Sequence, residues 1–281
     1  MVDYLQRAKF FRTKKRLGQN FLINGEVISD ILDYANISKD DTVLEIGPGV
    51  GFVTEQLVKY AKKVIAVELD EEAIKELEKL DADNLEIIHS DILKTDLSEL
   101  TDEKIKVVAN IPYYITSPII AHLLGEIDDL DNKNRKKITD IILMVQEEVA
   151  RRIVATPKSA SKQYGLLTIL SQFWADCSII RLVGRKSFYP APKVNSALVS
   201  LKVNVEPRLK LTDYAHYRKT IKSAFSQRRK TLKNCLVNSG FDKTKVTKAI
   251  LKMNLDENIR GEKLTIEEFG TLSELLLKNE F

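Results

Sequence analysis

Short runs of β-branched and other apolar residues recur along the chain from residue 42 onward. They occupy residues 42–47, 63–69, 84–91, 105–110 and 140–146. These runs show little polar alternation, so they are typical of strands that are buried on both faces of a parallel sheet. Helical patterns separate them, as in "DEEAIKELEKL", where Ala73, Ile74 and Leu77 lie along one face. Strands that alternate with helices in this way predict a doubly wound, Rossmann-like α/β sheet.

The pattern changes from mixed to purely helical near residue 204. Before that point, helical stretches at 147–155 and 164–175 lead into "CSIIRLV" and "SALVSLKV", which we expect to pair antiparallel at the edge of the sheet. After it, the patterns are helical: Thr265 stands three residues before Glu268, the spacing of a capping box, and Gly240 is placed to end a helix. We therefore predict two domains, residues 1–204 with the sheet and residues 205–281 as a small all-α domain.

Positive charge gathers in two regions of the chain. The 281 residues carry a net charge of +4, but residues 1–17 hold six Lys/Arg against one acid. Residues 205–260 hold fourteen Lys/Arg against five acids, so the remainder of the chain is acidic. Clustered Lys and Arg provide most of the affinity for a phosphate backbone, which makes a polyanionic partner the prediction. An ordinary solvated surface is the alternative for the C-terminal region taken by itself.

Several classes of protein are disfavoured by what the sequence lacks. No run of about 18 apolar residues is present, and the N-terminal segment has no apolar stretch of the secretory kind. The cysteines, Cys177 and Cys235, have neither metal-binding spacing nor the density of a disulfide framework, and the three histidines are scattered. We therefore expect a cytoplasmic protein with no metal site and no membrane partner. Nothing in the pattern calls for an extended apolar interface, so we expect a monomer.

A glycine-rich loop follows the first predicted strand in "LEIGPGVGF". Gly47 and Gly49 permit a tight turn and close approach of the backbone to a ligand. Glu68 and Asp91 end the next two strands, where one carboxylate suits ribose hydroxyls and the other an adenine amine, with the backbone of Ile92 against the ring. A plain turn and solvated strand ends remain the alternatives. Since the loop contains no Lys or Arg and no phosphate-binding motif follows it, the adenosine compound that fits is S-adenosylmethionine.

The fourth strand ends in "NIPYYITSP", residues 110–118. Asn and Pro often simply close a strand. Beside a methyl sulfonium, however, the Asn110 side-chain oxygen and a nearby backbone carbonyl could bind the two protons of an aromatic amine and expose its lone pair. Pro112 would stiffen the carbonyl, and Tyr113 would offer a face for a flipped base. Such a site works by positioning and needs no strong base.

A second aromatic candidate lies in "SFYPAPKVNSALV", residues 187–199. Phe188 precedes a proline-rich turn that leads into a strand, so it could close the base from its other side, with Lys193 near phosphate. A turn with a core phenylalanine is equally consistent with this local pattern.

Six motifs of this chain resemble, in order and spacing, those of the rRNA adenine dimethyltransferases. The resemblance extends over essentially the whole chain and is similar in detail to the bacterial branch that modifies small-subunit rRNA. It implies S-adenosylmethionine as cofactor and dimethylation of two adjacent adenosines in the 3′-terminal hairpin of that rRNA, within a late pre-ribosomal particle. The motifs are "GQNFL", "EIGPGVG", "VELD", "HSDIL", "NIPYYITSP" and "FYPAPKVNS".

The resemblance also assigns roles to individual residues. It implies that Asn20 and Leu22 cap the cofactor, that Glu68 holds its ribose, and that Asp91 meets its adenine beside the Gly47 loop. Asn110 would lie between cofactor and target, and Tyr113 and Phe188 would enclose the target base. The basic arm and the C-terminal helices would contact rRNA, mainly through phosphates.

Two other functions share this set of residues. One is dimethylation of a large-subunit rRNA adenosine, the type that confers macrolide resistance. The other is a binding protein of the same fold that serves as an assembly or transcription factor without catalysis. The intact "NIPY" and glycine motifs favour the enzyme.

Overall fold

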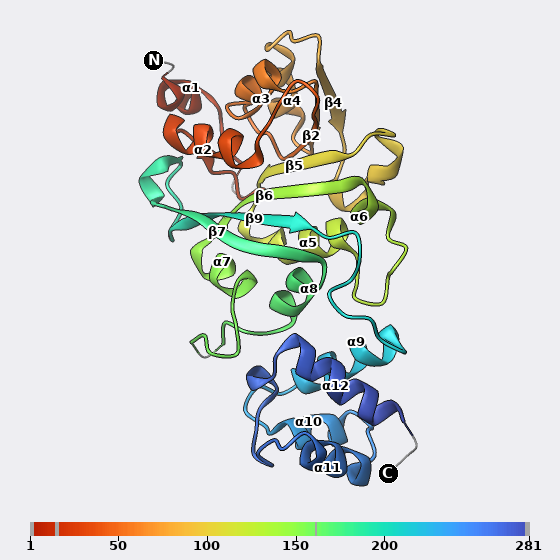
Figure 1. The fold of residues 1–281 in the computed structure, drawn as a ribbon. Helices are drawn as coiled ribbons and strands as arrows, with labels where there is room; N and C mark the ends of the chain where they lie inside the picture. The colour runs from red at the N-terminus through yellow and green to blue at the C-terminus, as the bar shows by residue number, and fades with distance from the viewer. Residues whose placement is uncertain (1–2, 15–16, 161, 279–281) are drawn as a thin grey trace. The chain divides into compact units, whose positions relative to one another are not determined.

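The computed structural model describes residues 3–14, 17–160 and 162–278. Its central feature is a seven-stranded sheet with the order β4-β3-β2-β5-β6-β9-β7 (Figure 1). The first five strands in this order run parallel, whereas β9 is antiparallel to both β6 and β7. The predicted Rossmann-like sheet and its late antiparallel pair are confirmed. The strands are β2 (Thr42–Ile46), β3 (Lys63–Glu68), β4 (Leu85–His89), β5 (Ile105–Asn110), β6 (Ile138–Gln146), β7 (Ala175–Val183) and β9 (Ser196–Val203).

Two very short strands lie outside this sheet. β1 (Phe21–Leu22) pairs antiparallel with β8 (Phe188–Tyr189), with Leu22 opposite Phe188. The pair joins the end of the N-terminal arm to the loop before β9, two segments that are far apart in the sequence.

Helices flank the sheet, and several begin at a side-chain cap. Asn24 accepts a hydrogen bond from Glu26 N at the start of α2, and Asp70 accepts one from Glu72 N at the start of α4. The helices in this part of the chain are α1 (Tyr4–Phe10), α2 (Gly25–Ala35), α3 (Thr54–Tyr60), α4 (Glu71–Glu78), α5 (Thr116–Leu124), α6 (Lys133–Lys137) and α7 (Glu147–Ile153). The 3-10 turns are η2 (Ile92–Lys94), η3 (Leu97–Glu99), η4 (Tyr113–Ile115) and η5 (Arg185–Ser187).

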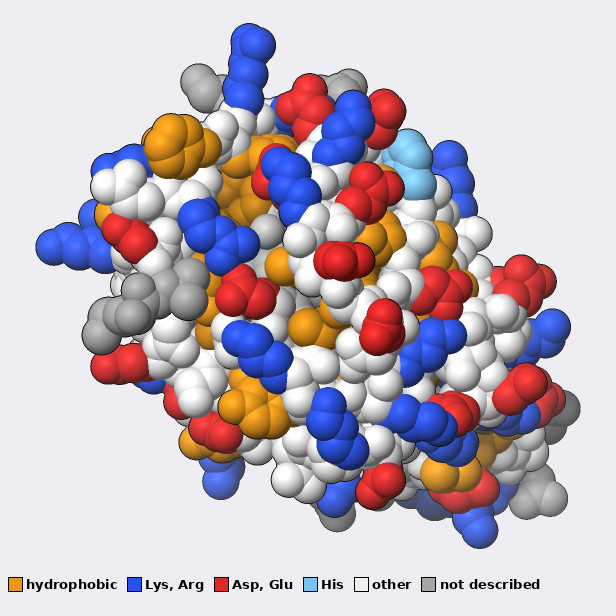
Figure 2. All heavy atoms as spheres, turned by 90° about the horizontal axis from the view of Figure 1, so that it is seen from above, with side chains coloured by type: hydrophobic (Ala, Val, Ile, Leu, Met, Phe, Trp, Pro, Cys, Tyr) orange, Lys and Arg blue, Asp and Glu red, His pale blue; other side chains and the backbone are white. Residues whose placement is uncertain are grey.

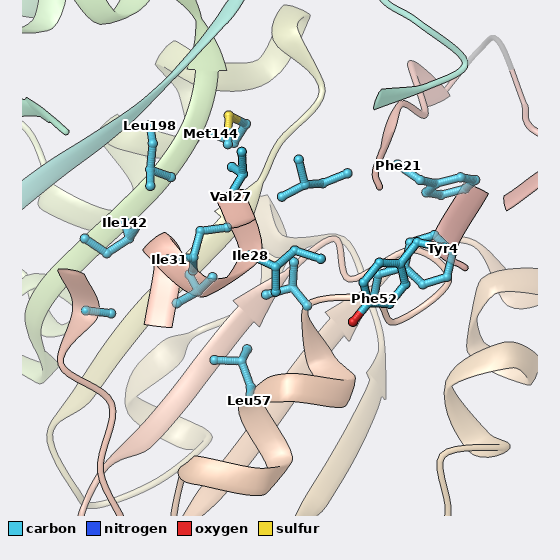
Figure 3. Packing of buried hydrophobic residues seen from close by; sticks show 14 of the residues in the cluster. Tyr4, Phe21, Val27, Ile28, Ile31, Phe52, Leu57, Ile142, Met144 and Leu198 are labelled. Carbon is cyan, nitrogen blue, oxygen red and sulfur yellow. The ribbon is translucent and has the colours of Figure 1, made fainter. Parts of the chain in front are cut away.

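The apolar face of α2 packs against the sheet. Figure 3 shows Val27 and Ile31 of this helix pointing toward strand residues such as Met144, and all three are buried. In the same view Phe21 and Phe52 lie close together, with ring centroids 6.5 Å apart. This core holds the strand ends and the arm in place, so it positions the polar groups described below.

The remaining helices form a compact unit of their own with an aromatic core. Its elements are α8 (Leu166–Trp174), α9 (Tyr214–Ala224), α10 (Leu232–Asn238), α11 (Lys243–Lys252), η6 (Gly261–Lys263) and α12 (Ile266–Leu277). Phe173 of α8 stacks near Tyr217 at 5.6 Å, and the Tyr217 hydroxyl donates to Ile266 O at 3.0 Å. The predicted capping box of Thr265 and Glu268 is present, and Gly240, with φ +89°, follows the end of α10.

The chain divides into two compact units. The first contains Met1–Gly125, Asp131–Arg151 and Ala175–Val205, and the second contains Glu126–Leu130, Arg152–Trp174 and Glu206–Phe281. The helical unit thus includes α8, which lies before the boundary predicted at residue 205, because the aromatic residues of α8 complete its core. Within the described part of the chain, no helix has the length and apolar character needed to cross a bilayer.

Candidate functional site

One pocket at the carboxyl ends of the parallel strands gathers most of the predicted cofactor residues. Doubly wound folds bind ligands at this edge, where the strand order reverses. The described side chains that line the pocket include three carboxyl groups and no Lys or Arg. The predicted residues in its wall are Asn20, Leu22, Gly47, Gly49, Glu68, Asp91, Ile92 and Asn110.

The glycine loop has a backbone that only glycine adopts without strain. Gly47 and Gly49 have φ values of +64° and +58°. A Cβ added to Gly49 would lie 2.7 Å from Phe21 Cε1, because the Phe21 ring packs directly on the loop. The loop is therefore held in one shape both by its own conformation and by the N-terminal arm.

Glu68 joins the end of β3 to this loop. Its Oε2 accepts a hydrogen bond from Gly49 N at 2.9 Å, and its Oε1 accepts from Leu69 N and Asp70 N, both at 2.8 Å. The side chain is only 8% exposed. Glu68 thus satisfies three backbone donors as well as lining the pocket, and a carboxylate oxygen can accept more than one hydrogen bond.

A second buried carboxyl group, Glu45 on β2, lies in the same wall. Burial, together with the neighbouring Glu68 carboxyl, raises the pKa of Glu45 to about 8. Within the described part of the chain, Glu45 Oε2 and Thr54 Oγ1 have no hydrogen-bond partner of good geometry, although the Thr54 hydroxyl lies close enough to oppose part of the rise in the Glu45 pKa. Glu45 is therefore mostly protonated at neutral pH.

Asp91 and Ile92 form the next part of the wall. Asp91 Oδ1 accepts from Leu93 N at 3.1 Å and so caps the 3-10 turn η2, while Ile92 is 6% exposed. None of the hydrogen bonds found among the described residues uses Asp91 Oδ2. A planar ligand between these groups would meet one carboxylate oxygen and one apolar surface.

The orientation of the Asn110 side chain is determined by the N-terminal arm. Asn110 Nδ2 donates to the backbone carbonyl of Asn20 at 3.0 Å, and Asn20 Nδ2 donates to Gly18 O at 2.9 Å. A backbone carbonyl can only accept, so the amide nitrogen of Asn110 must face it. The Asn110 side-chain oxygen is then left for the pocket.

A polar network fixes the arm beside the pocket. Lys14 Nζ and Gln19 Nε2 donate to the two oxygens of Asp70 at 2.6 and 2.7 Å, and Lys14 N donates to Gln19 Oε1 at 2.7 Å. Burial opposes ionisation of Asp70, but the hydrogen bonds from Lys14 and Gln19 outweigh it and hold the pKa of this carboxyl below its usual value. Sequence reasoning missed this network: Gln19 and Asp70 lie in the motifs "GQNFL" and "VELD" but were given no role, and Lys14 counted only as one of the basic residues of the arm.

Tyr113 and Phe188, the two aromatic residues predicted to enclose the target base, differ in what the structure shows of them. The backbone of Tyr113 belongs to the 3-10 turn η4, but its side chain lies outside the described residues. Phe188 is 3% exposed, belongs to the core around Phe21 and Leu22, and is absent from the described pocket lining. Stacking of Phe188 on a base stays a prediction, and it requires the ring to leave that core.

Tyr114 is an aromatic residue of the pocket that sequence reasoning quoted without giving it a role. It follows Tyr113 in η4, lines the pocket, and is 63% exposed. Glu45 was likewise quoted within "EIGPGVG" without a role. Their positions within these motifs could have indicated a role, but a tyrosine and a glutamate are not unusual at such positions and so gave no stronger signal.

The chemistry available in this pocket is binding and orientation. Within residues 3–14, 17–160 and 162–278, no three His, Cys, Asp or Glu side chains are grouped so that they could hold a metal ion. The pocket combines carboxyl groups for hydroxyls, an apolar wall for a ring, and the amide oxygen of Asn110 for an N–H donor. These groups suit a nucleoside compound without phosphates.

Known proteins with related sequences and structures agree with this chemistry. The family model described as ribosomal RNA adenine dimethylase matches residues 10–278. A ribosomal RNA small subunit methyltransferase A of Clostridium botulinum (strain Langeland) is 44% identical over 270 residues, which cover 95% of this chain and 94% of the relative. A dimethyladenosine transferase from Plasmodium falciparum has a TM-score of 0.71 at 28% identity, covering 89% of this chain and 94% of that structure.

The solved structure of a large-subunit rRNA methyltransferase is almost as similar in fold as the dimethyladenosine transferase. The 23S rRNA methyltransferase ErmE has a TM-score of 0.70 at 26% identity, covering 92% of this chain and all of that structure. The fold and the identity of these two structures therefore do not separate the two kinds of relative. Several curated relatives at 41–44% identity, however, are named ribosomal RNA small subunit methyltransferase A. With a family model that spans nearly all of its length, the chain belongs to the ribosomal RNA adenine dimethylase family.

Proposed function

We propose that this protein transfers methyl groups from S-adenosylmethionine to the N6 amines of two adjacent adenosines in the 3′-terminal hairpin of small-subunit rRNA. Each adenosine receives two methyl groups, and the substrate is a late pre-ribosomal particle. The observation that carries the proposal is the orientation of Asn110, whose nitrogen faces Asn20 O and whose oxygen is thereby free to accept from a substrate amine.

The composition of the pocket wall supports S-adenosylmethionine as the cofactor. A phosphate-bearing nucleotide would require cationic side chains or a phosphate-binding loop, and the described lining has no Lys or Arg. In the proposed complex Glu68 accepts from the ribose hydroxyls, Asp91 accepts from the adenine amine, and Ile92 covers the ring. Asn20 and Leu22 close the pocket from the arm.

The protein groups act on the substrate amine by position. The cofactor supplies an electrophilic methyl group on a sulfonium. Hydrogen bonds from the amine to Asn110 and to a backbone carbonyl of the Ile111–Pro112 segment hold the nitrogen so that its lone pair faces that methyl. S-adenosylmethionine bound there would supply the methyl group and leave as the neutral thioether, and the extra proton on the methylated nitrogen would leave for solvent.

Two basic regions would bind the rRNA backbone. Arg228, Arg229 and Lys230 are exposed in the turn between α9 and α10. On the face shown in Figure 2, basic and acidic side chains are interleaved, and Arg7 and Lys14 of the arm pair with Glu55 and Asp70 at 2.6 Å each. The arm therefore offers less free charge than its composition indicates. The same holds in the helical unit for Arg208, Arg218 and Lys222, which pair with Glu267 and Glu126.

The small subunit is favoured over the large subunit by the comparison of relatives. The chain is 44% identical to a small subunit methyltransferase and 26% identical to the 23S rRNA enzyme. Purely non-catalytic binding is disfavoured because the pocket retains the predicted cofactor residues and Asn110 in the orientation that the reaction needs.

The test is methyl transfer from labelled S-adenosylmethionine to three substrates: unmethylated small ribosomal subunits, large subunits and free rRNA. We expect label in the small subunits, mapped as dimethyladenosine at two adjacent positions near the 3′ end. Label in large-subunit rRNA would assign the chain to the other substrate, and tight binding without label would contradict the enzymatic proposal.

A further inference from the structure

Tyr114 has an unusual setting for an exposed aromatic residue. Single exposed apolar side chains are common and need no explanation by themselves. Tyr114, however, lies in the turn that follows Asn110 and Pro112, and it forms part of the pocket wall with them. Its ring is 63% exposed at a site where a nucleic acid base must enter.

The backbone beneath the ring is shaped to support it. A Cβ added to Gly18 would lie 3.4 Å from Tyr114 Cε1 and 3.3 Å from Pro112 Cβ, so both residues lie directly against the Gly18 backbone. Gly18 has φ +62°, a conformation that other residues rarely adopt. The Tyr114 ring is thus supported on the side of Gly18 and open to solvent elsewhere.

No other described aromatic residue of the pocket wall offers such a surface. Phe21 is 6% and Phe52 is 3% exposed, and both belong to the core. Phe188 is buried outside the described lining. Among the described aromatic residues of the wall, Tyr114 is therefore the one that an approaching base can contact.

The substrate requires a second binding position. When one of two adjacent adenosines enters the pocket, it leaves the stack of its neighbour, and that neighbour loses a stacking partner. Proteins that hold unpaired RNA bases commonly replace this partner with an aromatic side chain. An exposed ring beside the pocket mouth has the chemistry to do so.

We propose that Tyr114 forms a second nucleotide subsite, on which the adenosine next to the target stacks while the target occupies the pocket. The inference rests on the proposed function, because it requires an RNA substrate with an unpaired purine beside the target. Tyr114 is a positioning residue in this scheme, since it holds the neighbour of the reacting base and leaves the cofactor untouched.

The experiment compares three variants on unmethylated small ribosomal subunits: Tyr114→Ala, Tyr114→Phe and Tyr34→Ala. Tyr34 lies on α2, is 59% exposed and lies outside the pocket wall, so it is a matched control for loss of an exposed tyrosine. We expect Tyr114→Ala to raise the KM for subunits roughly tenfold, as loss of one base–aromatic stack does. Tyr114→Phe and Tyr34→Ala should stay within about twofold of wild type. The dissociation constant for S-adenosylmethionine, measured by calorimetry, should be the same in all four proteins.

Three results would overturn the subsite. They are an unchanged KM in Tyr114→Ala, an equal loss in Tyr114→Phe, or a parallel loss of cofactor affinity, which would mean that the ring shapes the cofactor pocket. In each case the wild-type protein methylates the subunits, so the proposed function stands. Wild-type protein that leaves the subunits unmodified would overturn the proposed function and the subsite with it.

Discussion

The pocket is built differently on the β3 side and on the β5 side. On the β3 side, Glu68 is buried and accepts three backbone N–H groups, and the glycine loop is covered by Phe21. On the β5 side, Asn110 is held by a hydrogen bond to the arm, and Tyr114 is open to solvent. A cofactor of constant shape benefits from a preorganised wall, whereas a large RNA must approach an open one. The difference supports the proposed roles, in which the β3 side binds the cofactor and the β5 side receives the RNA.

Substitution of Asn110 should have the largest effect, and this effect should be confined to the β5 side of the pocket. In Asn110→Ala the amine loses its acceptor, so we expect kcat to fall by about 1000-fold or more, while cofactor affinity stays within about tenfold. Asn110→Asp keeps an acceptor oxygen but cannot donate to Asn20 O, so it should also be strongly impaired. Single-turnover methyl transfer and calorimetry separate the two quantities. Near-normal turnover in Asn110→Ala would remove the assigned role.

Substitution of Gly49 should affect the β3 side. Gly49→Ala combines a positive φ with a contact of 2.7 Å to Phe21, so we expect a loss of about 1–3 kcal/mol in stability and roughly 100-fold weaker cofactor binding. Gly25→Ala is the matched control, because Gly25 begins α2 and nothing lies within 4 Å of an added Cβ. Calorimetry and denaturant unfolding measure both effects. Equal behaviour of the two variants would show that the loop is not preorganised.

Substitution of Glu68 tests whether the same carboxyl serves loop and ligand. Glu68→Ala leaves three backbone donors without their acceptor and removes the group proposed for ribose, so cofactor affinity should fall by roughly 10- to 100-fold. Glu68→Gln keeps one acceptor oxygen and should lose less. Glu71→Ala, on the exposed surface of α4, controls for loss of a nearby acid. Unchanged binding enthalpy and affinity in Glu68→Ala would place this residue outside the ligand site.

Substitution of Glu45 should change the pH dependence of stability. Its pKa is about 8 in the folded chain against an ordinary value of 4.5, so below about pH 4.5 both states hold the proton. Between pH 4.5 and pH 8 only the folded chain holds this proton. The free energy of unfolding therefore falls by up to about 1.4 kcal/mol per pH unit as the pH rises through this range. Glu45→Gln should flatten this slope. Urea unfolding between pH 5 and 8 tests the prediction, and parallel curves would contradict it.

Much of the fold could be read from local patterns. All five parallel strands and the late antiparallel pair were predicted from apolar runs, because burial on both faces leaves a signal in every residue of a strand. The membership of α8 in the helical unit could not be read this way. It depends on aromatic packing between Phe173 and Tyr217, which are separated in the sequence by β7 and β9.

The residues of the candidate site could be predicted from the sequence, but the contacts that they make could not. Eight predicted residues share one pocket, because the carboxyl ends of parallel strands meet at one edge of the sheet. Burial of Phe188 was not predictable, since its local pattern fits an exposed loop aromatic and a core residue equally well. Burial is decided by what packs around the ring, in this case β1.

The sequence by itself determined the strand order along the chain, the glycine loop and the motif that ends β5, because these depend on residues close together in sequence. The tertiary structure decided which groups face one another. The bond from Gly49 N to Glu68 spans 19 residues, and the bond from Asn110 to Asn20 spans 90. Contacts of this kind form only when the core brings distant segments to a common edge. The direction of the Asn110 amide, on which the proposed chemistry depends, is therefore a property of the folded chain.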